Sequence, residues 1–242
     1  ATISPAQQAT ALVELSGQSS VSMPTGNFAA SNAYTGGLQG RAAEVRIAMA
    51  DMPEGAAGPA TQNAGNGLGV WAQGFASWAD QDNETQSGDE MLGYESDTQG
   101  FVVGMDKVMD QWVFGFSTGG TWTDVDTNDI NAQTDISAWQ LGPYVSFNTK
   151  KFYVDFGGAY SWSDIESSRK ITFLGLTAKG ETESDTWSAY ANAGYNFCIN
   201  KLTLTPTAGL SYTWTDIDSY SETGAAGANL SVDDNDSDTF FL

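Results

Sequence analysis

The chain contains no histidine, the residue that serves most often as a general base and as a metal ligand. It contains a single cysteine, Cys198, which excludes an internal disulfide bond and a thiolate metal cluster. Because these two absences remove much of the chemistry from which catalytic and metal sites are built, we expect no enzyme activity, no cofactor and no metal centre.

Positive charge is also scarce. The 242 residues include 9 Lys+Arg and 30 Asp+Glu, which gives a formal net charge of −21. Phosphate binding requires clustered cations, so this balance argues against nucleic acid as a partner. It also argues against a basic patch that docks onto anionic lipid.

Long hydrophobic runs are absent. The mean hydropathy is −0.28, and the sequence has no run of about 18 apolar residues, the length that a membrane-spanning helix requires. A membrane-spanning β-strand is still possible, because its hydrophobic residues alternate with polar ones and its average hydropathy is low.

The composition changes near Gly67. Before it the chain is rich in Ala, Ser and Gly, and Phe28 and Tyr34 are its only aromatic residues. After it Trp, Tyr and Phe recur throughout. We therefore predict a leader over 1–66 and a β region over 67–242. Within the leader, the Ala-rich stretch 27–50 predicts a helix interrupted at Gly36 and Gly37, and 51–66 reads as a connector.

The β region shows a period of two, which is typical of strands whose faces meet different surroundings. In 151–164, one face is apolar and aromatic and the other is small and polar. The segments 111–123, 184–198 and 201–215 repeat the pattern, 97–106 and 136–148 follow it less cleanly, and a final segment starts at 229. In 68–79 the phase is ambiguous, because Trp71 and Phe75 fall on one face and Trp78 on the other.

The length of these segments favours a membrane. Spanning strands need about 9–11 residues, whereas strands of soluble proteins most often have about 5–6. Aromatic residues lie near both ends of the segments, as in the aromatic girdles of transmembrane barrels. We predict an all-β, antiparallel transmembrane barrel. The predicted lipid-facing girdle is Trp112, Trp122, Phe152, Trp162, Trp187 and Trp214, and predicted lumen-facing residues are Ser117, Thr121, Asp155, Asn192 and Thr207.

The connections also differ between the two predicted rims. Those at 107–110, 148–151 and 199–201 are tight, whereas those at 80–93, 124–132, 164–182 and 216–233 are long and acidic. Outer-membrane barrels place short turns at the periplasmic rim and long loops outside. This pattern therefore predicts which end of the barrel faces the cell exterior.

The same sequence patterns allow a soluble fold, a nucleophile motif and calcium loops as other interpretations. A soluble β-sandwich would bury the aromatic face and would require more charge on its polar face than Gly, Ser and Thr supply. Residues 115–119 match the G-x-S-x-G pattern, but they lie inside a predicted strand and the chain has no histidine partner. Residues 124–128 and 234–238 resemble incomplete calcium loops. Solvated acidic loops are the preferred interpretation, and weak divalent-ion binding stays open.

Several blocks together resemble the translocator of type Va autotransporters. Residues 11–18 are similar to the Ala-Leu-x-x-Leu-Ser-Gly-Glu signature that precedes this translocator, with Gln18 in place of the glutamate. Residues 69–78, 94–107 and 112–115 resemble its first strand, its second strand and the start of its third. The order and spacing of the blocks carry the resemblance.

The resemblance implies a twelve-stranded barrel that ends in an aromatic residue read by the barrel-assembly machinery. This sequence offers about seven or eight strands, and its last residue is Leu242. Unpaired sheet edges are not tolerated in hydrocarbon. We therefore expect a C-terminally truncated barrel that lacks about four strands and part of another.

The function implied by the resemblance is export or anchoring of an upstream passenger domain at the surface of a Gram-negative bacterium. The implied partners are outer-membrane lipid, the passenger in cis and the assembly machinery. We expect the 27–50 helix in the lumen, with Arg41 and Arg46 meeting inward carboxylates such as Asp155. A porin or adhesin-type barrel without a passenger and a soluble β-rich binding protein stay open as alternatives.

Overall fold

The computed structural model describes residues 5–17, 22–51, 68–86, 89–128, 130–199 and 202–242. Two helices come first, α1 (Pro5–Leu15) and α2 (Ser22–Asp51), and β-strands follow. No helix in these segments is both long enough and apolar enough to cross a membrane. The predicted connector 51–66 lies almost entirely outside the described residues.

One antiparallel sheet of eight strands dominates the molecule, and its strands neighbour one another in chain order. Among the described strands, the sheet's two edges are its first and last members. The strands are β1 (Leu68–Gln81), β4 (Tyr94–Met109), β5 (Trp112–Thr127), β6 (Ala132–Asn148), β7 (Phe152–Ile171), β8 (Leu176–Tyr195), β11 (Thr207–Ile217) and β14 (Asn235–Phe241).

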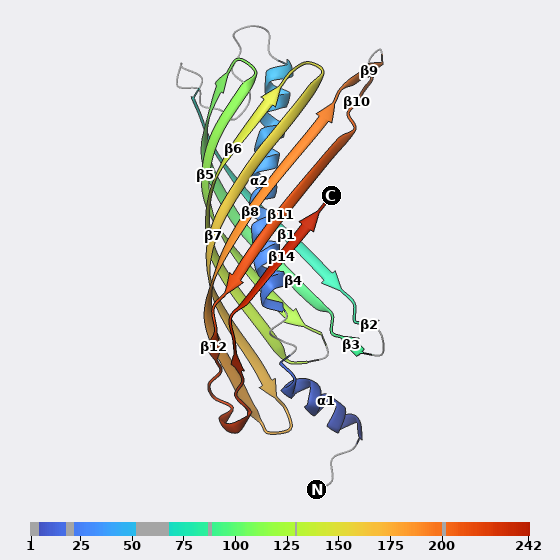
Figure 1. Cartoon of the computed structure of the whole chain (residues 1–242), viewed down its shortest axis with the longest axis vertical. Helices are drawn as coiled ribbons and strands as arrows, with labels where there is room; N and C mark the ends of the chain where they lie inside the picture. The colour runs from blue at the N-terminus through green and yellow to red at the C-terminus, as the bar shows by residue number, and fades with distance from the viewer. Residues whose placement is uncertain (1–4, 18–21, 52–67, 87–88, 129, 200–201) are drawn as a thin grey trace.

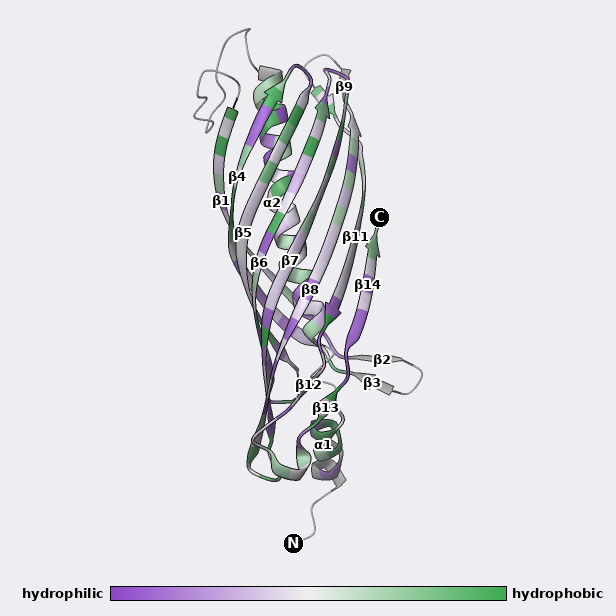
Figure 2. Cartoon of the chain, turned by 60° about the vertical axis from the view of Figure 1, so that its left-hand side comes forward, coloured by the Kyte–Doolittle hydropathy of each residue, from purple (hydrophilic) through white to green (hydrophobic). Residues whose placement is uncertain are grey.

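Short elements decorate the connections between these strands. They are β2 (Glu84–Gln86) with β3 (Asp89–Met91), β9 (Phe197–Ile199) with β10 (Leu202–Leu204), β12 (Tyr220–Ser221) with β13 (Ser231–Val232), and the 3-10 helix η2 (Ala226–Ala228). The sheet curves around α2, which runs along its concave side (Figure 1). Figure 2 shows α1 at the end where the β7–β8 hairpin turns. The predicted antiparallel sheet with a preceding helix is confirmed.

The two faces of the sheet differ as the alternation predicts. The convex face carries large aromatic side chains that stay 40–57% exposed, including Trp112, Phe116, Phe152, Phe156 and Trp187. The concave face buries small polar residues such as Ser161 and Thr123. A soluble sandwich would have buried the aromatic face, so this arrangement contradicts that alternative.

Two predicted loops are strands instead. Pairing of β5 with β6 continues to Thr127 opposite Ala132, and pairing of β7 with β8 continues to Ile171 opposite Leu176. The predictions of long loops over 124–132 and 164–182 are therefore wrong. Asp124, Asp126, Asp164 and Glu166 are exposed on the outer face, while Val125 and Ile165 are buried on the inner face. The alternation thus continues beyond the aromatic girdle, and the backbone ladder continues with it.

The predicted strand 201–215 is divided. Its first part pairs as β10 with β9, and its second part, β11, begins after Pro206. Proline lacks the backbone N–H that a central strand donates to its neighbour, which explains the break. The strand predicted over 184–198 begins earlier in the structure, because β8 begins at Leu176.

Helix α2 is continuous for 30 residues, so the predicted interruption at Gly36 and Gly37 is wrong. Each helical glycine costs about 1 kcal/mol relative to alanine, but packing against the sheet supports most helices in proteins. A Cβ on Gly37 would lie 3.0 Å from Val102 Cγ1, and one on Gly26 would lie 2.4 Å from Ile136 Cδ1. These glycines allow the helix to approach the wall closely.

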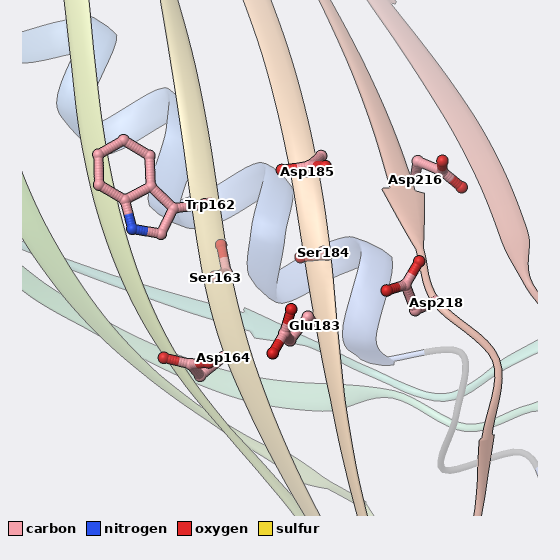
Figure 3. Close-up of a pocket in the computed structure, with 8 residues that line it drawn as sticks. All are labelled: Trp162, Ser163, Asp164, Glu183, Ser184, Asp185, Asp216 and Asp218. Atoms are coloured by element: carbon pink, nitrogen blue, oxygen red, sulfur yellow. The ribbon is translucent and has the colours of Figure 1, made fainter.

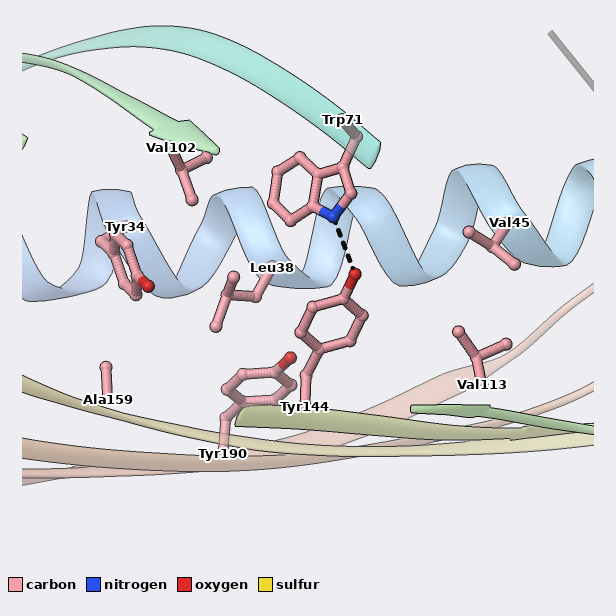
Figure 4. Packing of buried hydrophobic residues seen from close by; sticks show 9 residues of the cluster. All are labelled: Tyr34, Leu38, Val45, Trp71, Val102, Val113, Tyr144, Ala159 and Tyr190. Carbon is pink, nitrogen blue, oxygen red and sulfur yellow. Dashed lines mark hydrogen bonds between the residues drawn. The ribbon is translucent and has the colours of Figure 1, made fainter. Parts of the chain in front are cut away.

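The main core lies between α2 and the concave face of the sheet. Tyr34, Leu38 and Val45 from the helix meet side chains from six strands (Figure 4). The wall contributes Trp71, Val102, Val113, Tyr144, Ala159 and Tyr190. The helix therefore occupies the space that the curved sheet encloses.

Candidate functional site

The lumenal face of the sheet contacts α2 through two ion pairs. In the first, Arg41 Nε lies 2.7 Å from Asp106 Oδ2, and Arg41 Nη2 lies 3.2 Å from Asp106 Oδ1. Arg41 and Asp106 are each 2% exposed. Two parallel N–H···O bonds between a guanidinium and a carboxylate fix both the distance and the orientation of the partners.

Two aromatic side chains complete this first ion pair. Tyr144 Oη donates to Asp106 Oδ2 at 2.9 Å. Trp71 Nε1 donates in turn to Tyr144 Oη at 2.9 Å, the hydrogen bond drawn in Figure 4. The Arg41 guanidinium carbon lies 5.8 Å from the centre of the Trp71 ring. Elements α2, β1, β4 and β6 therefore converge on one carboxylate, which receives hydrogen bonds from both a cation and a phenol.

In the second ion pair, Arg46 Nη1 lies 3.0 Å from Asp155 Oδ2 and 3.2 Å from Asp155 Oδ1. The Arg46 guanidinium carbon lies 3.4 Å from the centre of the Tyr153 ring. Ser146 Oγ also donates to Asp155. Arg46 of the helix is thus stacked on Tyr153 of β7 and paired with Asp155, which lies two residues further along the same face of that strand.

Neutral hydrogen bonds continue this contact along the helix. Tyr34 Oη and Ser117 Oγ are 2.7 Å apart, and Asn192 Nδ2 donates to Gln39 Oε1 at 3.0 Å. Gln140 Nε2 donates to the backbone carbonyl of Ala30 and to Thr121 Oγ1. The polar groups on the inner wall therefore match polar groups on α2 over much of its length.

The structure places the predicted lumenal residues as follows. Ser117, Thr121 and Asp155 are buried on the inner face, and Asn192 is half-buried beside α2. Thr207 lies at the start of β11, on the same face as buried Thr213 and Thr215, but it is exposed because β14 does not reach it. Ser117 of the 115–119 pattern lies within β5 and contacts Tyr34, as the strand interpretation requires.

Asp106, Tyr144 and Trp71 were not among the predicted site residues. Asp106 lies near the end of β4, where an acidic residue resembles an ordinary turn residue. Its inward position follows from the register, in which Asp106 pairs with Gly69 on one side and Gly115 on the other. Counting the alternation from buried Val102 would have placed Asp106 on the inner face.

Inward aromatic rings lie over glycines of neighbouring strands. A Cβ on Gly115 would lie 2.1 Å from Tyr144 Cζ, and a Cβ on Gly157 would lie 2.5 Å from Tyr190 Cε1. Because glycine has no side chain, the ring can lie against the adjacent backbone instead of projecting into the lumen. This arrangement leaves room for α2.

The predicted girdle residues all lie on the outer face. Trp112, Trp122, Phe152, Trp162 and Trp187 are exposed, and Trp214 is half-buried. Beyond Trp162 the outer face becomes acidic, with Asp164, Glu183, Asp185, Asp216 and Asp218 lining a surface hollow (Figure 3). Among the residues that the structure describes, no group of three or more His, Cys, Asp or Glu is arranged to hold a metal ion.

Comparisons with known proteins agree with this architecture. The family model "Autotransporter beta-domain" matches residues 70–242. Outer membrane protein B of Rickettsia conorii is 27% identical over 204 residues, which cover 77% of this chain and 12% of that protein. Outer membrane protein A of the same species is 30% identical over 72% of this chain and 9% of its own length. An extracellular serine protease of Serratia marcescens is 26% identical over 66% of this chain and 15% of its own length.

A solved structure has the same fold. The translocator domain of the autotransporter NalP from Neisseria meningitidis superposes with a TM-score of 0.60 and 18% sequence identity, covering 85% of this chain and 66% of that one. The curated relatives are far longer than the chain, which spans 9–15% of the three compared above. Because the family model matches most of the chain, the protein belongs to the autotransporter β-domain family and is an outer-membrane β-barrel translocator of a Gram-negative bacterium.

Proposed function

We propose that this β-domain anchors a passenger segment, joined to it upstream of Ala1, at the cell surface and helps to export it. In this proposal residues 1–66 are the leader that connects passenger and barrel, and residues 67–242 are the barrel part. Helix α2 fills the lumen after export. The low coverage of the much longer relatives supports the presence of a further domain in the whole protein.

The observation that carries the proposal is the attachment of α2 to the inner wall. Two ion pairs, Arg41 with Asp106 and Arg46 with Asp155, join the helix to β4 and β7. An ion pair removed from water is strongly destabilised when one partner is lost, because the other charge stays buried and unpaired. The wall is therefore matched to a helix with cations at these two positions, as expected for a chain segment that stays in the pore.

An open porin fits these observations less well. A porin lumen is filled with water, whereas here Tyr34, Leu38 and Ala42 of α2 are buried against the wall. The many small residues of the inner face support the same reading, because they leave space for a helix about 10 Å wide. We therefore favour a plugged translocator over a passenger-free channel.

The proposal also covers the remaining partners. The exposed aromatic face supports direct contact with lipid. We propose that the barrel-assembly machinery inserts the chain, and that any enzymatic activity of the whole protein belongs to the passenger. The net charge of −21 supports the absence of nucleic acid among the partners.

Electrical conductance tests the plug. We would insert the full-length protein and a variant lacking residues 27–50 into planar bilayers and compare single-channel currents. Deletion should raise the conductance severalfold, because the helix no longer occupies the lumen. A matched variant, Arg41→Met with Arg46→Met, should increase the frequency of transient openings while keeping the closed level. Equal conductance of the deletion variant and the parent would contradict the plug.

Surface accessibility tests export. An epitope tag placed upstream of Ala1 should become accessible to antibody on intact cells that express the full-length protein. Asp106→Ala should reduce the surface signal, since it removes the buried carboxylate partner of Arg41 on the wall. Asp135→Ala removes an exposed outer carboxylate and serves as the matched control. A tag that stays inside cells containing correctly folded barrel would contradict the export role.

A further inference from the structure

Helix α1 is held by the protein at a place separate from the lumen. The β7–β8 hairpin extends beyond the girdle residue Trp162 to its turn after Ile171, and α1 packs beside that end (Figure 2). The segment 222–230 lies against the same hairpin, since Lys179 and Thr223 exchange backbone hydrogen bonds at 2.8 Å. These three elements meet outside the layer that the aromatic girdle defines.

One cation, Arg169 of β7, joins all three elements. Its Nε donates to Glu222 Oε1 at 3.1 Å, and its Nη2 donates to the same carboxylate and to the carbonyl of Ala228 at 3.1 Å. Its Nη1 donates to the backbone carbonyl of Glu14. The side chains of Arg169 and Glu222 are only 3% and 4% exposed.

The Glu14 carbonyl belongs to the last turn of α1, where helix carbonyls have no partner within the helix. A cation at this end also interacts favourably with the helix dipole. Gly17 follows with a φ of +75°, the left-handed conformation that commonly ends a helix. Arg169 therefore binds the C-terminal end of α1 through a backbone carbonyl that any helix end presents.

The side chain of Glu14 makes a second attachment. It is 2% exposed, and its Oε2 accepts a hydrogen bond from the backbone N–H of Thr172 at 3.0 Å, at the hairpin turn. Ala11 of the same helix is also buried. The carbonyl and the side chain of Glu14 thus bind two neighbouring points of one hairpin end, Arg169 on β7 and the backbone of Thr172 in the turn.

We propose that the end of the β7–β8 hairpin and the 222–230 segment form a docking site for α1, which fixes the exported chain to the rim of the barrel independently of the lumenal helix. The proposal rests on the proposed function, in which the chain upstream of α2 leaves the barrel at the cell surface. The buried ion pair of Arg169 and Glu222, which lies outside the lumen, supports the proposal. The remaining hydrogen bonds of Arg169 go to the carbonyl of Glu14 in α1 and to the carbonyl of Ala228 in the 222–230 segment. The site recognises the C-terminal turn of a helix with a glutamate in that turn.

Distances between spin labels test the docking site in the full chain. With Cys198 changed to Ser, labels are attached at Leu12→Cys on α1 and at Leu174→Cys in the hairpin turn, two exposed positions. Pulsed electron spin resonance in detergent should give one narrow distance distribution. Arg169→Met and, separately, Glu14→Ala should each at least double its width, because α1 leaves the hairpin.

Lys170→Met is the matched control, because Lys170 is the exposed neighbour of Arg169 and should leave the distribution narrow. Heat-modifiable gel mobility verifies that each barrel is folded. If Arg169→Met does not fold, Glu14→Ala decides the question, because it changes only the helix. Narrow distributions in folded Arg169→Met or Glu14→Ala protein would overturn the proposal. The distance measurement requires no passenger, so it tests the docking site even if the proposed export role is wrong.

Discussion

Arg41 of the lumenal helix and Asp106 of β4, 65 residues apart in the chain, form two hydrogen bonds in a site where both are almost inaccessible. The pair is enclosed by Trp71 and Tyr144, of which Tyr144 also bonds to Asp106. Because both side chains are only 2% exposed, bulk water cannot replace the hydrogen bonds that either one loses when its partner is removed. The stability of the plugged barrel should therefore depend strongly on both members being present.

Removal of one member of this pair should be costly. We expect Asp106→Ala to lower the free energy of unfolding by about 3 kcal/mol, because buried Arg41 keeps only the exposed carboxylate of Glu44, 3.5 Å from its Nη1, as a counter-charge. Denaturant titration of the refolded protein in detergent measures this loss. The double variant Arg41→Met with Asp106→Ala should lose less than the sum of the two single variants. Additive losses would show that the two residues do not act as a pair.

The shape of the second cation should matter as well as its charge. Arg46→Lys keeps the charge beside Asp155 but loses the flat group stacked on Tyr153, so we expect a loss of about 1 kcal/mol in unfolding free energy. Arg46→Met should lose more, since it leaves Asp155 without its cation. Lys151→Met, at an exposed turn, should change the same quantity by less than about 0.5 kcal/mol. An Arg46→Lys variant as stable as the parent would count against the stacking.

Replacing two glycines with alanine should change the free energy of unfolding in opposite directions. Gly115→Ala places a methyl group where the Tyr144 ring lies, and it should cost about 1–3 kcal/mol of unfolding free energy. Gly36→Ala should gain about 0.5–1 kcal/mol, because a Cβ there meets nothing within 4 Å and alanine favours the helix. Thermal and denaturant midpoints of the two variants test the difference. The same sign for both would contradict the packing described for Gly115.

Depth in the membrane should decide the effect of an outward charge. Phe156→Arg introduces a charge on the outer face between Phe152 and Trp162, and it should cost about 2–4 kcal/mol of folding free energy in lipid vesicles. Asp164→Arg lies on the same face beyond Trp162 and should cost at most about 0.5 kcal/mol. Similar penalties at both positions would mean that the aromatic girdle does not mark the lipid boundary.

Much of the fold could be predicted from local patterns. The spacing from Phe152 to Trp162 has the length of one membrane crossing, and its alternating residues separate the exposed from the buried face. The same period continues through Asp164 and Glu166, but their charge suggested a loop. The strand persists there because Ile165 and Ile171 still supply a buried face, and backbone pairing does not depend on outward side chains.

The candidate site could be predicted only in part. Arg41 and Arg46 were identifiable because cations are rare before Lys107, and Asp155 because it interrupts a small, inward face. Asp106 was not identifiable from the sequence, since its role requires the register of three strands around a helix. The burial of Thr207 depended on a neighbour as well, because β14 pairs with β11 only from Ser211 onward and leaves Thr207 uncovered.

The sequence by itself determined the alternation, and with it the antiparallel strands, their aromatic outer face and their small inner face, because a period of two needs no distant partner. The closeness of α2 to the wall, the choice of Asp106 as the partner of Arg41, and the attachment of α1 through Arg169 were decided only by the tertiary structure. These contacts join residues far apart in the chain, and their geometry exists only when the curved sheet has brought several strands around the helix.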